Sequence, residues 1–309
     1  KQKFGEHQIK LMVGGNIEIS KYTKLGASRD ELLVPGLSDL NLAVGQNQTI
    51  VGGGYEWGTT GVFSRINYNY KQKYLLEVNG RYDGTSKFPT AKQFGFFPSV
   101  SAGWRISEES FMDATRGWLD NLKVRGSYGS LGNSNISPYV FIEQLKAARS
   151  PIIIGGNQPA YISAPVALAD KFTWETATTL DFGIDVDLLS SRLSTSFDWY
   201  NRKTTDMITA GPLLPVVFGA SVPRGNYADL ETKGFELSLK WNGKIKTPSP
   251  ISYGVRLTLG DNVSYITKYN NPQGVVTADV NLFTTNYYVG QRVGDIWGLT
   301  TEGLFTSAE

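Results

Sequence analysis

The sequence predicts an all-β protein in which antiparallel strands cross a membrane as part of a β-barrel. Three observations support this class: long stretches alternate between apolar and polar residues, aromatic residues gather near the ends of these stretches, and short connections alternate with long ones. Alternation with a period of two indicates a strand, because successive side chains point to opposite faces of a sheet. A tilted membrane-spanning strand needs roughly 9 to 11 residues, whereas strands of globular proteins average about 5 to 6.

The stretch RINYNYKQKYLLEVNGRYDG, residues 65–84, predicts a hairpin. On either side of the Lys71-Gln72 pair, nearly every second residue is apolar or aromatic and its neighbours are mostly polar. Two alternating runs joined by two residues are typical of a tight β-hairpin. Tyr68, Tyr70 and Tyr74 flank the turn, as the aromatic girdle of a membrane barrel requires.

The same alternation recurs along the rest of the chain. It is cleanest in TLDFGIDVDL, where Leu180, Phe182 and Ile184 oppose Asp181 and Asp185. About nine or ten strands are therefore expected, on the pattern of alternating segments separated by turn residues. The other predicted strands lie within residues 8–19, 96–106, 122–129, 192–202, 235–242 and 251–266, with a weaker last candidate at 294–305.

The connections predict that the two ends of the sheet differ. Short connections fall at Lys71-Gln72, at Ser190-Ser191 and at 243–250. Outer-membrane barrels keep short turns in the periplasm and long loops outside the cell, so the long segments are expected to be extracellular. These long segments, rich in Gly, Pro, Asn and aromatic residues, span 20–60, 132–172, 203–233 and 267–293.

One connection on the side of the short turns, SEESFMDATRGWLDNL, predicts a short periplasmic helix. Ser107 is the expected N-cap. Glu108 and Glu109 then fall in the first turn, where the helix dipole favours acidic side chains.

Composition excludes several classes of function. The chain of 309 residues carries 30 basic and 28 acidic side chains, so it lacks the basic footprint of a nucleic-acid-binding protein. Cysteine is absent and the one histidine, His7, has no partner for a metal site, so it is expected to be an ordinary strand-end residue. Gly52–Gly54 lack the strand-to-helix context of a phosphate loop and are expected to form a flexible loop. We expect no enzymatic activity and no cofactor.

A soluble β-sandwich would also show alternation. Strand length and the position of Trp104, Trp199 and Trp241 near strand ends on the apolar face favour the membrane barrel. Four aspartates on the polar faces could form a cation site or an acid pair, but a water-filled or plug-facing lumen accounts for them without chemistry. These are Asp181, Asp185, Asp187 and Asp198.

Four segments resemble the SusC/RagA family of TonB-linked outer-membrane transporters. The most recognisable is NYKQKYLLEVNGRYDGTSKFPTAKQFGFFPSVSAGWRISEESFM, residues 69–112. It is followed by LKVRGSYGSLGN (122–133), FTWETATTLDFGIDVDLLSSRLSTSFDWYNRKTTDMI (172–208) and YVGQRVGDIWGLTTEGLF (288–305). Their order along the chain makes the resemblance specific, because one strand pattern alone would not distinguish this family from other barrels.

The resemblance implies a barrel of about 22 strands with a plugged lumen in the bacterial outer membrane. It also implies energy from the TonB-ExbB-ExbD complex through a segment before the barrel, and a SusD-like lipoprotein that captures glycans or peptides. Residues 1–309 are then expected to be a partial TonB-dependent receptor β-barrel domain. We expect Lys1 and Glu309 to be the ends of a fragment, with the plug domain and the remaining strands outside it.

Aromatic residues in or beside the long segments are the candidates for substrate contact. Sugar rings present apolar faces that stack on aromatic planes, and loops carry function disproportionately. The alternative is that these rings only pack the loops together. The candidates are Tyr139, Phe141, Tyr161, Trp174, Phe218 and Tyr227.

Three functions from different classes remain open on the sequence. Active import by a TonB-dependent transporter is the leading hypothesis, and a passive porin or structural outer-membrane barrel is the alternative. A plug-encoding segment upstream of Lys1 would separate these two. A soluble carbohydrate-active enzyme or lectin is the weakest hypothesis, and it would require a pair of catalytic carboxylates in a cleft.

Overall fold

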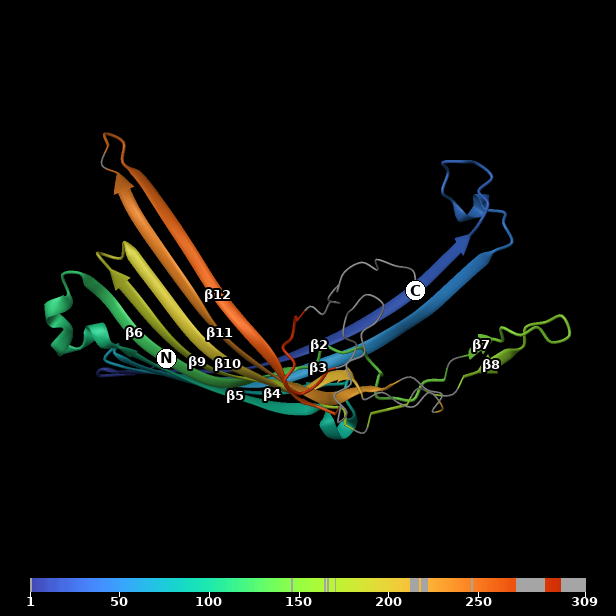
Figure 1. Cartoon of the computed structure of the whole chain (residues 1–309), viewed down its shortest axis with the longest axis horizontal. Coiled ribbons are helices and arrows are strands. Elements are labelled where there is room, and N and C mark those ends of the chain that lie inside the picture. The colour runs from blue at the N-terminus through green and yellow to red at the C-terminus, as the bar shows by residue number, and fades with distance from the viewer. Residues whose placement is uncertain are drawn as a thin grey trace, which may run out of the picture.

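The computed structural model describes residues 2–145, 147–163, 165, 167–169, 171–211, 217, 222–245, 247–270 and 287–295. Within these residues an antiparallel sheet of ten strands follows the order β1-β2-β3-β4-β5-β6-β9-β10-β11-β12, and β7 and β8 form a separate hairpin (Figure 1). The strands are β1 (Gln2–Phe4), β2 (His7–Arg29), β3 (Gln48–Tyr70), β4 (Tyr74–Thr85), β5 (Phe94–Arg105), β6 (Leu119–Asn133), β7 (Ala147–Arg149), β8 (Ala160–Ile162), β9 (Glu175–Leu188), β10 (Leu193–Ala210), β11 (Arg224–Ile245) and β12 (Ile251–Tyr269). Four 3-10 helices connect them: η1 (Leu40–Leu42), η2 (Thr90–Lys92), η3 (Ile106–Glu108) and η4 (Ser110–Thr115).

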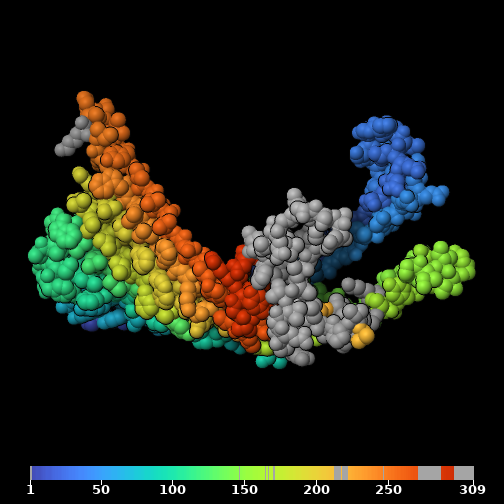
Figure 2. All heavy atoms as spheres, in the orientation of Figure 1, coloured from blue at the N-terminus to red at the C-terminus, as the bar shows by residue number. Residues whose placement is uncertain are grey.

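The sheet is a curved, open wall, and it is one layer thick over most of its area (Figures 1 and 2). The β3–β4, β9–β10 and β11–β12 turns lie at one end, which we call the turn end. The long β2–β3 hairpin tip and the β7–β8 hairpin extend from the other end, the mouth end (Figure 1). Antiparallel pairing enforces this separation, because each strand must return the chain to the opposite end.

The predicted hairpin at 65–84 is confirmed. β3 and β4 pair from Tyr70 opposite Tyr74 to Thr59 opposite Thr85. Lys71 and Gln72 both have positive φ, 54° and 61°, which is the backbone that matches the twist of a tight hairpin. The side chain of Asn69 accepts a hydrogen bond of 2.8 Å from the backbone N–H of Gln72 and so closes the turn.

One face of the wall is apolar and exposed. On β12, Val255, Leu257 and Leu259 are 61%, 59% and 58% exposed, and on β9 Ile184 is 43% exposed. No second layer covers these side chains within the described residues, and buried apolar side chains are concentrated near the mouth end. A face of this kind is stable only against an apolar surrounding, because contiguous exposed apolar area is unfavourable in water.

Two of the long segments are shorter than the sequence predicts, and the segment between β6 and β9 keeps its predicted length. The loops run over 30–47, 134–174 and 211–223, because β2, β3, β10 and β11 extend well beyond the predicted strands. The prediction of a flexible loop at Gly52–Gly54 is wrong, since all three residues lie in β3 and pair with β2. A Cβ on Gly54 would approach the carbonyl oxygen of Tyr22 to 2.6 Å, so close strand contact explains that glycine.

The predicted periplasmic helix is also not formed as expected. The segment between β5 and β6 contains two short 3-10 helices, η3 and η4, and Ser107 lies inside η3 instead of capping a helix. The buried Ser107 hydroxyl has no hydrogen-bond partner among the described residues. The Glu109 side chain bonds to Lys73, Tyr74 and Trp104, so tertiary contacts override the capping pattern. None of the described helical segments is long and apolar enough to cross a membrane.

The predicted last strand at 294–305 lies almost wholly outside the described residues, apart from Gly294 and Asp295. Just before it, Arg292 forms an isolated antiparallel bridge with Tyr265 of β12. The backbone of Val293 donates a hydrogen bond of 2.9 Å to the carbonyl oxygen of Ser264. This part of the chain therefore runs beside the last described strand.

Candidate functional site

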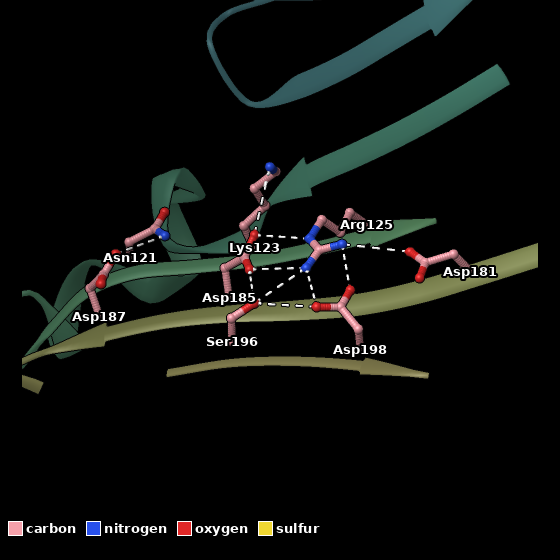
Figure 3. Close-up of polar contacts among 8 residues, drawn as sticks. All are labelled: Asn121, Lys123, Arg125, Asp181, Asp185, Asp187, Ser196 and Asp198. Carbon is pink, nitrogen blue, oxygen red and sulfur yellow. Dashed lines mark hydrogen bonds and ion pairs between the residues drawn. The ribbon is translucent and has the colours of Figure 1, made fainter. Parts of the chain in front are cut away.

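The polar face of the sheet carries a cluster of charges on β6, β9 and β10 (Figure 3). Strand register creates it, because Arg125 lies opposite Gly183 and Gly183 lies opposite Asp198. Residues directly opposite one another share a face of the sheet. We call the cluster the Arg125 network, and it consists of Lys123, Arg125, Asp181, Asp185, Ser196 and Asp198.

Arg125 reaches across a whole strand to form its closest contacts. Its Nη1 and Nη2 atoms lie 2.6 and 2.7 Å from the two carboxylate oxygens of Asp198 on β10. The Nη2–Oδ2 contact is a charge-assisted hydrogen bond, whereas the Nη1–Oδ1 contact is an ion pair in which Oδ1 has no hydrogen-bond partner among the described residues. A Cβ at Gly183 would lie 2.4 Å from Cζ of Arg125, so only glycine on β9 lets the guanidinium pass over the backbone.

Two more aspartates surround the same guanidinium. Its Nε donates to Asp185 Oδ2 at 3.2 Å, and Nη1 lies 3.5 Å from Asp181 Oδ1. The Ser196 hydroxyl donates to Asp185 at 2.9 Å, and Lys123 lies 3.7 Å from the same carboxylate. Because each acid faces a cation or a hydroxyl, the cluster is a fixed polar wall and has no free acid pair for general acid–base chemistry.

The fourth predicted aspartate, Asp187, lies apart from Arg125 and accepts a hydrogen bond of 3.2 Å from Asn121. The polar face continues across β3, β4 and β5 with amide and charged groups around Glu77. Asn79 donates to Glu77 at 2.9 Å, Asn67 also donates to it, and Arg65 lies 3.6 Å away. Within the described residues no group of three or more acidic or histidine side chains is arranged to hold a metal ion.

A buried aromatic cluster lies at the mouth end. Phe88, Phe97, Phe172 and Trp174 are at most 8% exposed, and we call them the mouth cluster. The ring centroids of Phe88 and Phe97 each lie 5.3 Å from that of Trp174. The indole N–H of Trp174 donates to the carbonyl oxygen of Gln93 at 3.1 Å. The cluster therefore ties the β4–β5 connection to the segment that precedes β9.

Asn226 on β11 fixes residues 171–174, the segment that precedes β9. Its buried side-chain amide exchanges two hydrogen bonds with the backbone of Thr173, of 2.7 and 3.0 Å, and also donates to the carbonyl oxygen of Asp206 at 2.5 Å. Asp206 has a φ of 57° at an irregularity in the pairing of β10 with β11. Its carboxylate pairs with Lys171 at 2.5 Å. Residues 171–174 are thus held against both strands by side-chain and backbone bonds.

The structure places the predicted substrate-contacting residues in different settings. Tyr139 is 39% exposed, and its hydroxyl bonds to both the N–H and the carbonyl oxygen of Glu56 on β3, at 3.0 and 2.9 Å. Phe141 packs against the mouth cluster, and Trp174 belongs to it. Tyr161 is 46% exposed on β8, and Tyr227 is half-buried on β11. Phe218 lies outside the described residues.

Two neighbouring hollows of about 190 and 240 Å³ lie at the mouth end, and the first of them adjoins the mouth cluster. Phe172 and Glu175 line the first, Tyr139 and Leu168 line the second, and both share Val140 and Arg224. The first hollow and the mouth cluster therefore have Phe172 in common, and the predicted residue Tyr139 lines the second hollow.

Sequence reasoning missed Phe88, Phe97 and Asn226. Phe97 could have been noticed, because it interrupts the polar stripe of β5 that continues at Ser99 and Ser101. A large ring on a polar face indicates local packing. The ring of Phe97 lies over Gly132 on β6, where a Cβ would come within 2.0 Å of it. Nothing local distinguishes Phe88 or Asn226, whose partners are distant in the sequence.

Comparisons with known proteins agree with this architecture. Residues 5–304 match the family model described as "TonB dependent receptor-like, beta-barrel". TonB-dependent receptor P3 of Formosa agariphila is 28% identical to this chain, over 98% of the chain and 30% of the receptor. TonB-dependent receptor SusC of Bacteroides thetaiotaomicron is 30% identical, over 79% of the chain and 26% of SusC. The chain thus spans less than a third of the length of these relatives.

Solved structures show the same fold. The RagAB peptide transporter aligns with a TM-score of 0.75 at 23% identity, over 90% of this chain and 30% of that chain. The outer membrane transporter YddB from Escherichia coli aligns with a TM-score of 0.56 at 11% identity, over 86% of this chain and 32% of that chain. Since the family model matches nearly the whole chain and SusC is among its relatives, the chain belongs to the TonB-dependent receptors, as a SusC/RagA-type β-barrel segment of the bacterial outer membrane.

Proposed function

We propose that the chain forms part of the barrel of an active transporter that imports large nutrients, oligosaccharides or peptides, across the outer membrane. The observation that carries the proposal is the division of one sheet into an exposed apolar face and a polar face held by the Arg125 network. A transmembrane barrel with a polar lumen has this division. The names of the SusC and RagAB relatives support nutrient import over a purely structural role.

In this proposal the apolar face contacts lipid and the polar face lines the lumen. Leu76, Val78, Phe182, Ile184 and Leu239 are the lipid-facing residues, and Glu77, Arg81, Asp185 and Lys240 are the lumen-facing ones. The mouth end is extracellular, because it carries the longest connections. Residues 1–309 then form a portion of the barrel domain, and the plug and the remaining strands belong to other parts of the parent protein.

Substrate contact is proposed for Tyr139, Tyr161 and Tyr227, whose rings retain exposure at the mouth end. Phe141 packs against the mouth cluster and Trp174 belongs to it, so both are proposed to shape the mouth, and Phe218 is kept in the set from the sequence alone. A SusD-like lipoprotein is the proposed partner above the mouth, and the TonB-ExbB-ExbD complex is the proposed energy source. RagAB is described as a peptide transporter, which supports peptides as one substrate class for this chain.

Uptake measurements test active import against the passive porin. Cells that make the full-length protein are given labelled oligosaccharides or peptides, with TonB present or deleted. Active import predicts that uptake stops without TonB and after the proton gradient is collapsed. A porin predicts uptake that is unchanged by both treatments, and that result would refute the proposal. Co-purification of a surface lipoprotein with the barrel tests the proposed partner.

A further inference from the structure

The segment between β5 and β6, residues 106–118, has an exposed surface to which the proposed transport function assigns no role. We call it the connector; it lies at the turn end and protrudes from the wall as the green coil at the left of Figure 1. Glu109 holds it in place. The Glu109 carboxylate accepts hydrogen bonds from Tyr74 Oη at 2.7 Å and from Trp104 Nε1 at 3.1 Å, and it pairs with Lys73 Nζ at 3.0 Å.

Two of these partners belong to the apolar face. Tyr74 and Trp104 lie opposite each other on β4 and β5, in the same alternation as Leu76, Val78 and Val100. Their rings stack with centroids 6.4 Å apart. Glu109 therefore docks the connector against the rim of the apolar face and not over the polar face.

The rim itself is a row of aromatic rings across four strands. His7, Tyr70, Tyr74 and Trp104 follow one another through the register of β2, β3, β4 and β5. Consecutive ring centroids are 4.6, 6.2 and 6.4 Å apart. Rows of this kind lie at the level of lipid headgroups, because one side of each ring is apolar and the other can bond to water or polar groups.

The connector carries an ion-paired polar stripe and, outside that stripe, two exposed large apolar side chains. Residues three apart eclipse one another in a 3-10 helix, so Asp113 and Arg116 lie in one stripe and form an ion pair of 2.7 Å. Phe111 lies outside that stripe and is 67% exposed. Trp118, at the end of the connector, is 52% exposed. Two large apolar side chains are thus exposed on the segment that Glu109 attaches to the aromatic rim.

We propose that the connector is a membrane-interface anchor, in which Phe111 and Trp118 enter the boundary between headgroups and acyl chains of the periplasmic leaflet. The occupant of this surface is a phospholipid bilayer, because Glu109 attaches the connector to Tyr74 and Trp104 in the aromatic rim of a membrane wall. Amphipathic segments bind at this depth by their apolar side. The inference rests on the proposed orientation of the wall in the membrane and is independent of the transported substrate.

The charges around the connector favour a neutral lipid surface. Lys71 pairs with Glu6, Lys73 with Glu109, Arg105 with Glu108 and Arg116 with Asp113, at 2.7 to 3.1 Å. Since each of these cations already has an acidic partner, the described residues around the connector offer no excess positive charge to attract anionic headgroups. Phosphatidylcholine alone is therefore expected to suffice for anchoring.

Single-cysteine labelling tests the anchor, and the absence of cysteine from this chain makes it practicable. In the full-length protein, made otherwise cysteine-free, Phe111→Cys and Trp118→Cys are labelled with an environment-sensitive nitrobenzoxadiazole dye. The protein is reconstituted in phosphatidylcholine vesicles with or without lipid that carries a nitroxide near the headgroup. We expect quenching of both labels to exceed by severalfold that of the same dye at Asp113→Cys, on the polar stripe of the connector.

A label at Leu76→Cys, on the apolar face of β4, separates the possible failures. If that label is quenched by nitroxide lipid and the Phe111 and Trp118 labels are quenched no more than the Asp113 label, the anchor is refuted and the orientation stands. If the Leu76 label is not quenched either, the proposed orientation fails together with the anchor. Labels at 111 and 118 that are shielded from aqueous iodide but insensitive to nitroxide lipid would indicate a protein partner and would also overturn the proposal.

Discussion

The Arg125 network and the mouth cluster fasten adjacent parts of the same wall by different means. The network joins β6, β9 and β10 through side chains placed opposite one another by register. Its members remain partly solvated, with Arg125 and Asp198 side chains 29% and 21% exposed. The mouth cluster joins loops to the wall through rings that are almost fully buried. In the wall, the side chains of neighbouring strands are therefore linked by charges in contact with water. At the mouth, the loops are linked to the strands by buried apolar rings.

This difference implies different sensitivities. Partly exposed ion pairs contribute little each, because water and salt screen them. A buried aromatic ring contributes more, since its removal leaves a cavity as well as exposed area. Truncation at the mouth should therefore cost more free energy than neutralisation in the wall, although the mouth lies outside the membrane-spanning part in the proposed orientation.

The largest effect is expected from Trp174→Ala. Replacing a buried Trp by Ala costs roughly 3 to 5 kcal/mol, and this variant also loses the hydrogen bond to Gln93. We expect faster proteolysis of residues 134–174 in the full-length protein while the membrane-embedded strands still fold. Tyr161→Ala is the matched control, because Tyr161 is exposed on β8 and its removal should change stability by less than about 0.5 kcal/mol. Equal protease resistance of both variants would contradict the structural role of the mouth cluster.

A smaller effect is expected at the apolar face of the wall, which is proposed to contact lipid. Ile184→Arg should cost about 2 to 4 kcal/mol if the residue lies near the bilayer midplane. Ser127→Arg is the control, because it places the same cation on the polar face of the adjacent strand, opposite Asp181. Folding yields in detergent and urea unfolding in lipid measure the difference. Similar yields for the two variants would show that the faces are assigned wrongly.

Next in size is Arg125→Met, which removes the cation and keeps much of the side-chain volume. Asp181, Asp185 and Asp198 then face one another without a counter-charge. Since the network is partly exposed, the expected cost is about 1 to 2 kcal/mol, below the value for a fully buried pair. Adding Asp198→Asn should restore part of the loss. If urea unfolding shows the double variant to be less stable than Arg125→Met alone, charge repulsion is not the cause.

These two regions also differ in how far the sequence predicts them. The strands and their faces follow from period-two alternation. So do three of the four predicted aspartates, which lie beside Arg125, because register brings polar stripes of neighbouring strands together. The mouth cluster does not follow, since Trp174 meets Gln93 and Phe88 only after long loops fold back. The extra length of β2 and β3 was hidden by glycines, which weaken an alternating pattern. Ser107 fails as a cap because Glu109 forms tertiary bonds instead.

The smallest expected effect is a pH response of the connector. The hydrogen bond from Tyr74, then those from Trp104 and Lys73, lower the pKa of Glu109 from its usual 4.5 to about 2. A lowered carboxyl pKa means that the attachment is fully present above about pH 4.5 and is lost as the pH falls toward 2. The dye at Phe111→Cys should therefore change its emission over that acidic range, and Glu109→Gln should abolish the change. Glu108→Gln is the control, because Glu108 pairs only with Arg105 among the described residues and does not touch the aromatic rim. A pH response that survives in Glu109→Gln would show that another group holds the connector to the wall. The difference between this attachment and the salt-screened Arg125 network would then need a different explanation.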